Sequence, residues 1–124
     1  MKIQPSRPLN NDERAILNLL LQPEFEGVEQ LRGQADRAQV VSRCDCGCPT
    51  INIDVPEDMP SAAISGRLSP VELRVVPEGS DAPGEIIIFP KDGRLSSMEY
   101  VYYTRQPPEQ WPTPDRLTTV ELAR

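Results

Sequence analysis

The chain has 124 residues, an apolar fraction of 38% and a formal net charge of −6, which results from 19 acidic and 13 basic side chains. A chain of this length is predicted to form a single domain, over residues 1–124, with its own hydrophobic core. The negative charge disfavours nucleic acids and anionic membranes as partners, because both carry negative phosphates.

The amino end lacks the pattern of a signal peptide, because polar residues and prolines occupy positions 4–8. The apolar run at 19–21 is far shorter than a membrane-spanning segment. All three cysteines lie within residues 44–48, whereas a secreted disulfide scaffold spreads an even number of cysteines along its chain. We therefore expect a cytoplasmic protein with reduced thiols.

Residues 1–9 are predicted to form an extended lead-in before a helix. Asn10 or Asn11 can cap this helix, and Asp12 and Glu13 favour the positive end of its dipole. Apolar residues then recur at three- and four-residue spacing, which predicts that one face of the helix is buried. The helix is predicted to end before the next proline in the chain.

A second, shorter helix is predicted after Gly27, with Val28, Leu31 and Ala35 on one side. From about residue 38 the apolar period changes from helical to two, which is typical of strands. The remainder of the chain is therefore predicted to form a sheet.

Five strands are predicted from alternation and from the turn signals between them. Segment 85–89 is apolar on both faces, which predicts a strand inside the sheet. The dipeptide Asp92-Gly93 predicts a tight turn and an antiparallel hairpin, because both residues tolerate positive φ. The predicted strands lie near 38–44, 49–55, 70–76, 84–90 and 95–104.

This order of elements predicts an α+β fold in which two N-terminal helices pack on a mainly antiparallel sheet of about five strands. The proline-rich tail over residues 105–124 is expected to pack on that sheet, with Trp111 holding it in place.

The densest chemical signal is the sequence Cys-Asp-Cys-Gly-Cys-Pro, which places Cys44, Cys46 and Cys48 at two-residue spacing. In an extended segment such neighbours are about 7 Å apart, and a bend at the glycine and proline would draw the thiolates together around one soft ion. Zinc or copper(I) suits such ligands. Because the chain has no histidine, a fourth ligand for zinc must be Asp45, Asp54, water or another subunit.

Two other interpretations of the cysteines stay open. A redox or nucleophilic role needs an activated thiolate, and only Arg43 is a basic residue close in sequence. A packing role needs only that small, mildly apolar thiols fill the start of a hairpin.

The residue types of this chain allow few of the common enzyme active sites. The absence of histidine removes the Ser-His-Asp and Cys-His arrangements, and the scattered glycines form no phosphate-binding loop. No catalytic residue and no cofactor is therefore assigned, apart from the zinc or copper alternative.

Acidic and aromatic residues favour a protein partner, in particular a basic one. Glu24, Glu26 and Glu29 would attract such a surface, and Tyr102 and Trp111 would anchor it. The alternative is that the aromatic residues pack on the sheet. The first functional hypothesis is thus a non-enzymatic interaction module, and the second is a thiolate metal-binding protein. The oligomeric state stays open.

Four short motifs carry a resemblance to other proteins: Arg-Pro-Leu at 7–9, Cys-Gly-Cys-Pro at 46–49, Asp-Gly-Arg-Leu-Ser at 92–96 and Trp-Pro at 111–112. Together they resemble a group of small uncharacterised bacterial proteins. That resemblance implies no particular activity and assigns no site residue. The acidic, compact character is similar to that of immunity proteins of bacterial toxin systems, which implies an inhibitor of a partner protein.

Overall fold

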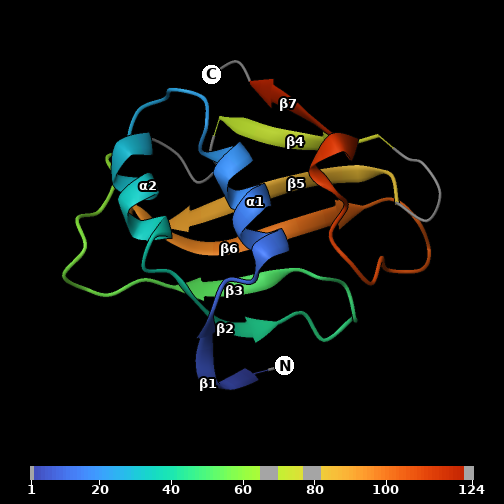
Figure 1. Ribbon diagram of the computed structural model, residues 1–124, viewed down its shortest axis with the longest axis horizontal. Helices are drawn as coiled ribbons and strands as arrows, with labels where there is room; N and C mark the ends of the chain where they lie inside the picture. The colour runs from blue at the N-terminus through green and yellow to red at the C-terminus, as the bar shows by residue number, and fades with distance from the viewer. Residues whose placement is uncertain (1, 65–69, 77–81, 122–124) are drawn as a thin grey trace.

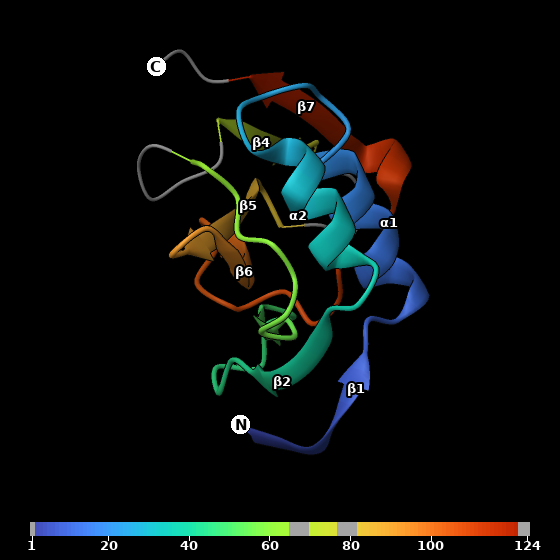
Figure 2. The ribbon, with the colours of Figure 1, turned by 90° about the vertical axis from the view of Figure 1, so that its left-hand side faces the viewer.

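Seven strands form one antiparallel sheet in the computed structural model, which describes residues 2–64, 70–76 and 82–121. Two helices cover one face of the sheet, as the two perpendicular views show (Figure 1 and Figure 2). The strands follow the spatial order β1-β2-β3-β6-β5-β4-β7, and each pair of neighbours is antiparallel. Their bounds are Lys2–Pro8 (β1), Gln39–Arg43 (β2), Ile51–Asp54 (β3), Val71–Val75 (β4), Gly84–Lys91 (β5), Arg94–Tyr102 (β6) and Leu117–Glu121 (β7).

Helix α1 (Asn11–Leu20) begins at the predicted capping site. The Asn10 side chain accepts a hydrogen bond from the Glu13 N–H at 2.8 Å, and the Glu13 carboxylate accepts one from the Asn10 N–H at 2.9 Å. This reciprocal capping box satisfies two backbone donors that the first turn would otherwise leave unpaired. Glu13 is only 2% exposed, and Arg7 at the end of β1 donates to both of its carboxylate oxygens. The charge pair therefore joins the edge strand to the helix.

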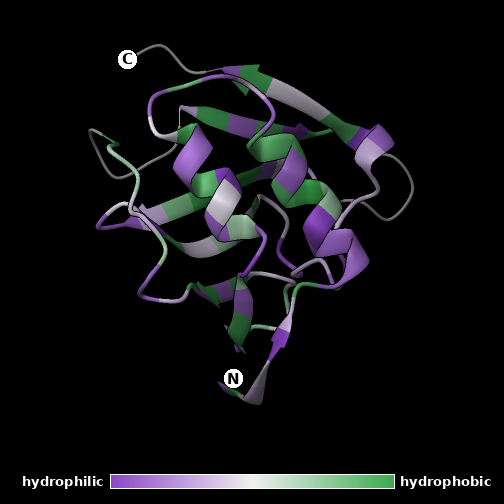
Figure 3. Cartoon of the chain, turned by 60° about the vertical axis from the view of Figure 1, so that its left-hand side comes forward, coloured by the Kyte–Doolittle hydropathy of each residue, from purple (hydrophilic) through white to green (hydrophobic). Residues whose placement is uncertain are grey.

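Helix α2 (Val28–Ala35) follows Gly27, whose φ of 88° lies in the left-handed region. Both helices carry hydrophobic and hydrophilic bands, as expected for helices with one buried and one solvated face (Figure 3). None of the described helices has the length and apolar character that crossing a membrane would require. The short 3₁₀ helix η1 (Pro114–Arg116) leads into β7.

The predicted hairpin between β5 and β6 is confirmed. Lys91 pairs with Arg94, and the two turn residues Asp92 and Gly93 both have positive φ. Strand β5 lies inside the sheet between β6 and β4, as its two apolar faces predicted. Gly93 is also approached by the preceding segment, because the Ala62 N–H donates to its carbonyl at 2.7 Å.

The core fills the space between the helices and the sheet, and one polar side chain lies within it. Gln34 of α2 is fully buried, where its amide donates to the carbonyls of Pro60 and Gly93 and its Oε1 accepts from the Leu95 N–H. These three bonds connect α2 to the segment before β4 and to the β5–β6 hairpin. The largest fully buried apolar side chains are Ile16, Leu17, Leu20, Leu31, Ile51, Leu73, Ile86, Ile88 and Met98.

The α+β class is correct, but the predicted position of the helices at the amino end and the predicted number of strands were wrong. The lead-in over 1–9 contains β1, so the two helices are not N-terminal, and the tail over 105–124 contains β7. Both added strands are sheet edges, β1 against β2 and β7 against β4. An edge strand uses only one side of its backbone for pairing, so Pro5 and Pro8 are tolerated in β1.

Candidate metal centre

The three cysteines lie in the connection between β2 and β3, at one end of the sheet (Figure 1). The last strand pair is Arg43 with Ile51, and the Cys44 N–H donates to the Thr50 carbonyl at 3.0 Å. Gly47 adopts a φ of 96°, a conformation that glycine reaches without strain. Strand pairing therefore closes the connection into a short bent loop.

The bend brings the three sulfur atoms together. The Sγ atoms of Cys44, Cys46 and Cys48 all lie within 4.8 Å of one another, and Cys44 Sγ is 2.9 Å from Cys46 Sγ. An ion about 2.3 Å from each of three sulfurs places them roughly 4 Å apart. The cluster therefore has the size of a three-thiolate metal site.

The three cysteine side chains differ in their exposure to solvent. Cys48 is only 3% exposed, Cys44 is half-buried and Cys46 is exposed. Packing of small apolar side chains, the alternative interpretation, accounts for Cys48 alone. An ion in this cluster would be anchored at the buried sulfur and reachable from solvent at Cys46.

Hydrogen bonds within the cluster separate the acidities of its thiols. They lower the pKa of Cys46 to about 7, chiefly because the Cys44 thiol donates to the Cys46 thiolate, with further support from the Cys48 thiol and N–H. The same bond raises the pKa of Cys44 to about 11, because the bond is lost when Cys44 ionises. Cys46 is therefore ready to act as a thiolate near neutral pH.

Tyr102 of β6 is an additional neighbour of the cluster. Its hydroxyl donates to Cys46 Sγ at 3.8 Å, which also raises the pKa of Tyr102. Strand β6 is brought there because it pairs with β3, and the Tyr100 N–H donates to Thr50 Oγ1 at 3.0 Å. From the sequence, Tyr102 was expected either to anchor a partner or to pack on the sheet. No local pattern connects it with a loop more than fifty residues earlier.

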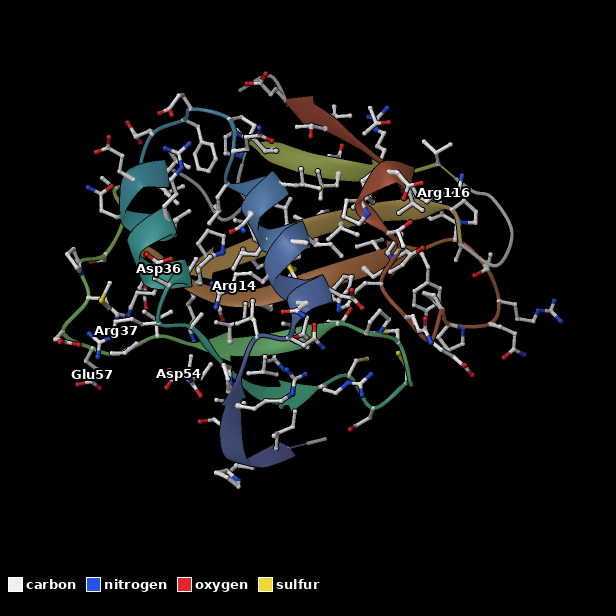
Figure 4. All side chains as sticks on the ribbon, in the orientation of Figure 1. Arg14, Asp36, Arg37, Asp54, Glu57 and Arg116 are labelled. Carbon is white, nitrogen blue, oxygen red and sulfur yellow. The ribbon has the colours of Figure 1, made fainter. Side chains whose placement is uncertain are left out.

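The two carboxylates considered as a fourth ligand do not join the sulfurs. Asp54 is the last residue of β3, whereas the loop joins that strand at its first residue, Ile51, and Figure 4 labels Asp54 at the end of β3 away from the loop. Asp45 lies between two of the cysteines, yet the group of ligand atoms within 4.8 Å contains the three sulfurs alone among the described residues. Among the residues that the structure describes, the donor set is thus three thiolates.

The other residues predicted to bind a partner do not form one surface. Glu24, Glu26 and Glu29 are exposed, but they lie in the α1–α2 connection and the first turn of α2, diagonally across the molecule from the β2–β3 connection (Figure 1). Glu24 forms an ion pair with Arg32 at 3.1 Å. The acidic residues are therefore separated from Tyr102.

Trp111 packs on the sheet, as the alternative interpretation of the aromatic residues predicted. Its ring stacks on that of Tyr100 with centroids 6.1 Å apart and an interplanar angle of 16°. Tyr100 is buried and its hydroxyl donates to the Ala82 carbonyl. The proline-rich tail is held on the core through this stack.

Comparison with protein-family models, with curated proteins and with solved structures finds no match for this chain. The function is therefore argued from the geometry of the cysteine cluster.

Proposed function

We propose that this protein binds one thiophilic metal ion through Cys44, Cys46 and Cys48. The observation that carries the proposal is that all three Sγ atoms lie within 4.8 Å of one another in a single hairpin connection. Three sulfur donors match a soft ion, and copper(I) is satisfied by thiolates alone. Zinc would need a fourth ligand such as water, since it is usually four-coordinate in proteins.

The site is better suited to handling an ion than to stabilising the fold. Backbone pairing of β2 with β3 and the Cys44–Thr50 hydrogen bond already close the loop. The domain also has an extensive core away from the cluster, unlike a zinc finger, which is unfolded without its metal. The exposed Cys46 would let a ligand or a partner's thiolate reach the ion.

Competition titrations test this proposal. The reduced chain, handled without oxygen, is titrated with copper(I) against a chromogenic copper(I) chelator, and with zinc against a zinc chelator. We expect one ion per chain for at least one metal, and loss of that binding in Cys48→Ser. The matched control is Asp45→Asn in the same loop, which should retain the wild-type stoichiometry. Equal binding by wild type and a triple Cys→Ser variant would contradict the proposal.

The interaction module that the sequence favoured first remains a prediction, as does its immunity-type form. Its acidic and aromatic residues are separated, whereas the three cysteines come together. The geometry therefore supports metal binding more strongly than the interaction module.

A further inference from the structure

The sulfur atoms of Cys44 and Cys46 are close to bonding distance. Their separation is 2.9 Å, whereas a disulfide bond is about 2.05 Å long. A movement of less than about 1 Å would join them. Both residues precede the bend at Gly47 and lie outside β2 and β3, so a bridge across the single intervening residue leaves the strand pairing in place.

Solvent exposure determines which of the three thiols an oxidant can reach. Cys46 is exposed and Cys44 is half-buried, so both can be reached from solvent. Cys48 is 3% exposed, which shields its sulfur from a bulky reagent. Oxidation of a thiol follows its accessibility and its thiolate character, so this arrangement favours one pair over the other two.

We propose that the cluster is a redox-gated metal site, in which a Cys44–Cys46 disulfide and the bound ion exclude one another. This inference rests on the proposed function. A disulfide sulfur no longer provides a thiolate, so oxidation leaves Cys48 as the single thiolate ligand of the cluster. One buried thiolate does not retain an ion that needs three, so the ion is released with its charge unchanged.

The oxidant is a low-molecular-weight disulfide of the glutathione type. The Cys46 thiolate attacks one sulfur of that disulfide, forms a mixed disulfide and releases one thiolate, which takes up the proton that Cys46 has lost. Cys44 then attacks the Cys46 sulfur, breaks the mixed bond and releases the second thiolate, which takes up the proton of Cys44. Two electrons pass from the protein to the reagent, and the products are one protein disulfide and two small thiols.

The test uses the full chain and glutathione disulfide. Reduced and oxidised samples are alkylated in denaturant, which exposes Cys48, and are then weighed by intact mass spectrometry and mapped by fragmentation. We expect three alkyl groups on the reduced chain and one on the oxidised chain, located on Cys48. The ion that binds the reduced chain should lose its stoichiometric binding after oxidation and regain it after reduction. Cys48→Ser should still form the bridge, whereas Cys44→Ser should not.

The outcomes separate this inference from the proposed function. A reduced chain that binds neither copper(I) nor zinc overturns the proposed function, whichever disulfide forms. A reduced chain that binds metal, but whose oxidised form retains the ion, overturns only the gating. Bridging between two chains, or glutathione adducts without a bridge, also overturns the gating, and bridging of Cys46 to Cys48 overturns the proposed Cys44–Cys46 bridge.

Discussion

Replacement of Gln34 by methionine should destabilise the protein strongly, although the side chain keeps nearly the same length. The substitution removes three hydrogen bonds of 2.8, 3.0 and 2.9 Å. The Gly93 carbonyl keeps its bond from the Ala62 N–H, so the Pro60 carbonyl and the Leu95 N–H lose a partner. The Leu95 N–H is buried, and leaving it unpaired costs about 1–3 kcal/mol. Pro60 is exposed, so the loss of the bond to its carbonyl adds only about 1 kcal/mol. We expect a total loss of about 3 kcal/mol in unfolding free energy.

Thermal and urea unfolding measure this loss. For a domain of this size about 3 kcal/mol corresponds to a fall in Tm of roughly 12 °C. The matched control is Gln30→Met, the same substitution at an exposed position of α2, which should shift the Tm by a degree or two at most. If the two variants unfold within about 2 °C of each other, the role given to the Gln34 amide is refuted.

Three further predictions concern the helix cap, two glycines and the exposed cysteine. Glu13→Gln should lower the unfolding free energy by about 1–2 kcal/mol, because it removes a buried carboxylate that is paired with the Arg7 guanidinium. The control Asp12→Asn, at an exposed position of the same turn, should lower it by about 0.5 kcal/mol or less. Equal losses of the two variants in urea unfolding would contradict this. Gly93→Ala should destabilise the protein by at least about 1 kcal/mol more than Gly47→Ala. Both glycines have positive φ, but an added Cβ at Gly93 would overlap the Ala62 carbonyl oxygen, whereas one at Gly47 would face open space. Equal thermal shifts of the two variants would refute that contact. In the metal-free protein the alkylation rate of Cys46 should rise with pH and reach half of its maximum near pH 7, because the lowered pKa of Cys46 makes this residue a thiolate above that pH. A midpoint near the ordinary pKa of 9.0 would count against the hydrogen bonds that lower the pKa.

Local signals in the sequence predicted much of this fold. Asn10 and Glu13 act within four residues of each other, and the turn at Asp92 and Gly93 depends on two adjacent φ angles, so both features can be inferred from short segments. Each of the five predicted strands is present within a few residues of its expected bounds.

Features that depend on distant contacts were missed. Strand β1 contains two prolines, and β7 is short and largely exposed, so neither has the composition of an interior strand. Both form because a neighbouring strand offers them an open edge. Gln34 occupies a helix position whose burial is set by the loop and hairpin that its amide contacts, and nothing in its own helix indicates them.

The candidate site was predicted only in part, because some of its features also depend on distant contacts. The spacing of the cysteines and the glycine between them indicated a shared site, which the bend of the loop brings about. The sequence left the fourth ligand open, and the fold places Asp54 at the wrong end of its strand. The sequence also gave no indication that Tyr102 contacts Cys46, because that contact depends on the pairing of β3 with β6.

The most direct test of metal binding is the metal-to-protein ratio of untagged protein purified without chelators, measured by elemental mass spectrometry together with a free-thiol count. We expect about one copper or zinc ion per chain, with thiols protected from alkylation, and no metal in the triple Cys→Ser variant. A metal-free protein that also takes up neither ion after reduction, with all three thiols free, would contradict the account and leave the cysteines as residues of a hairpin turn.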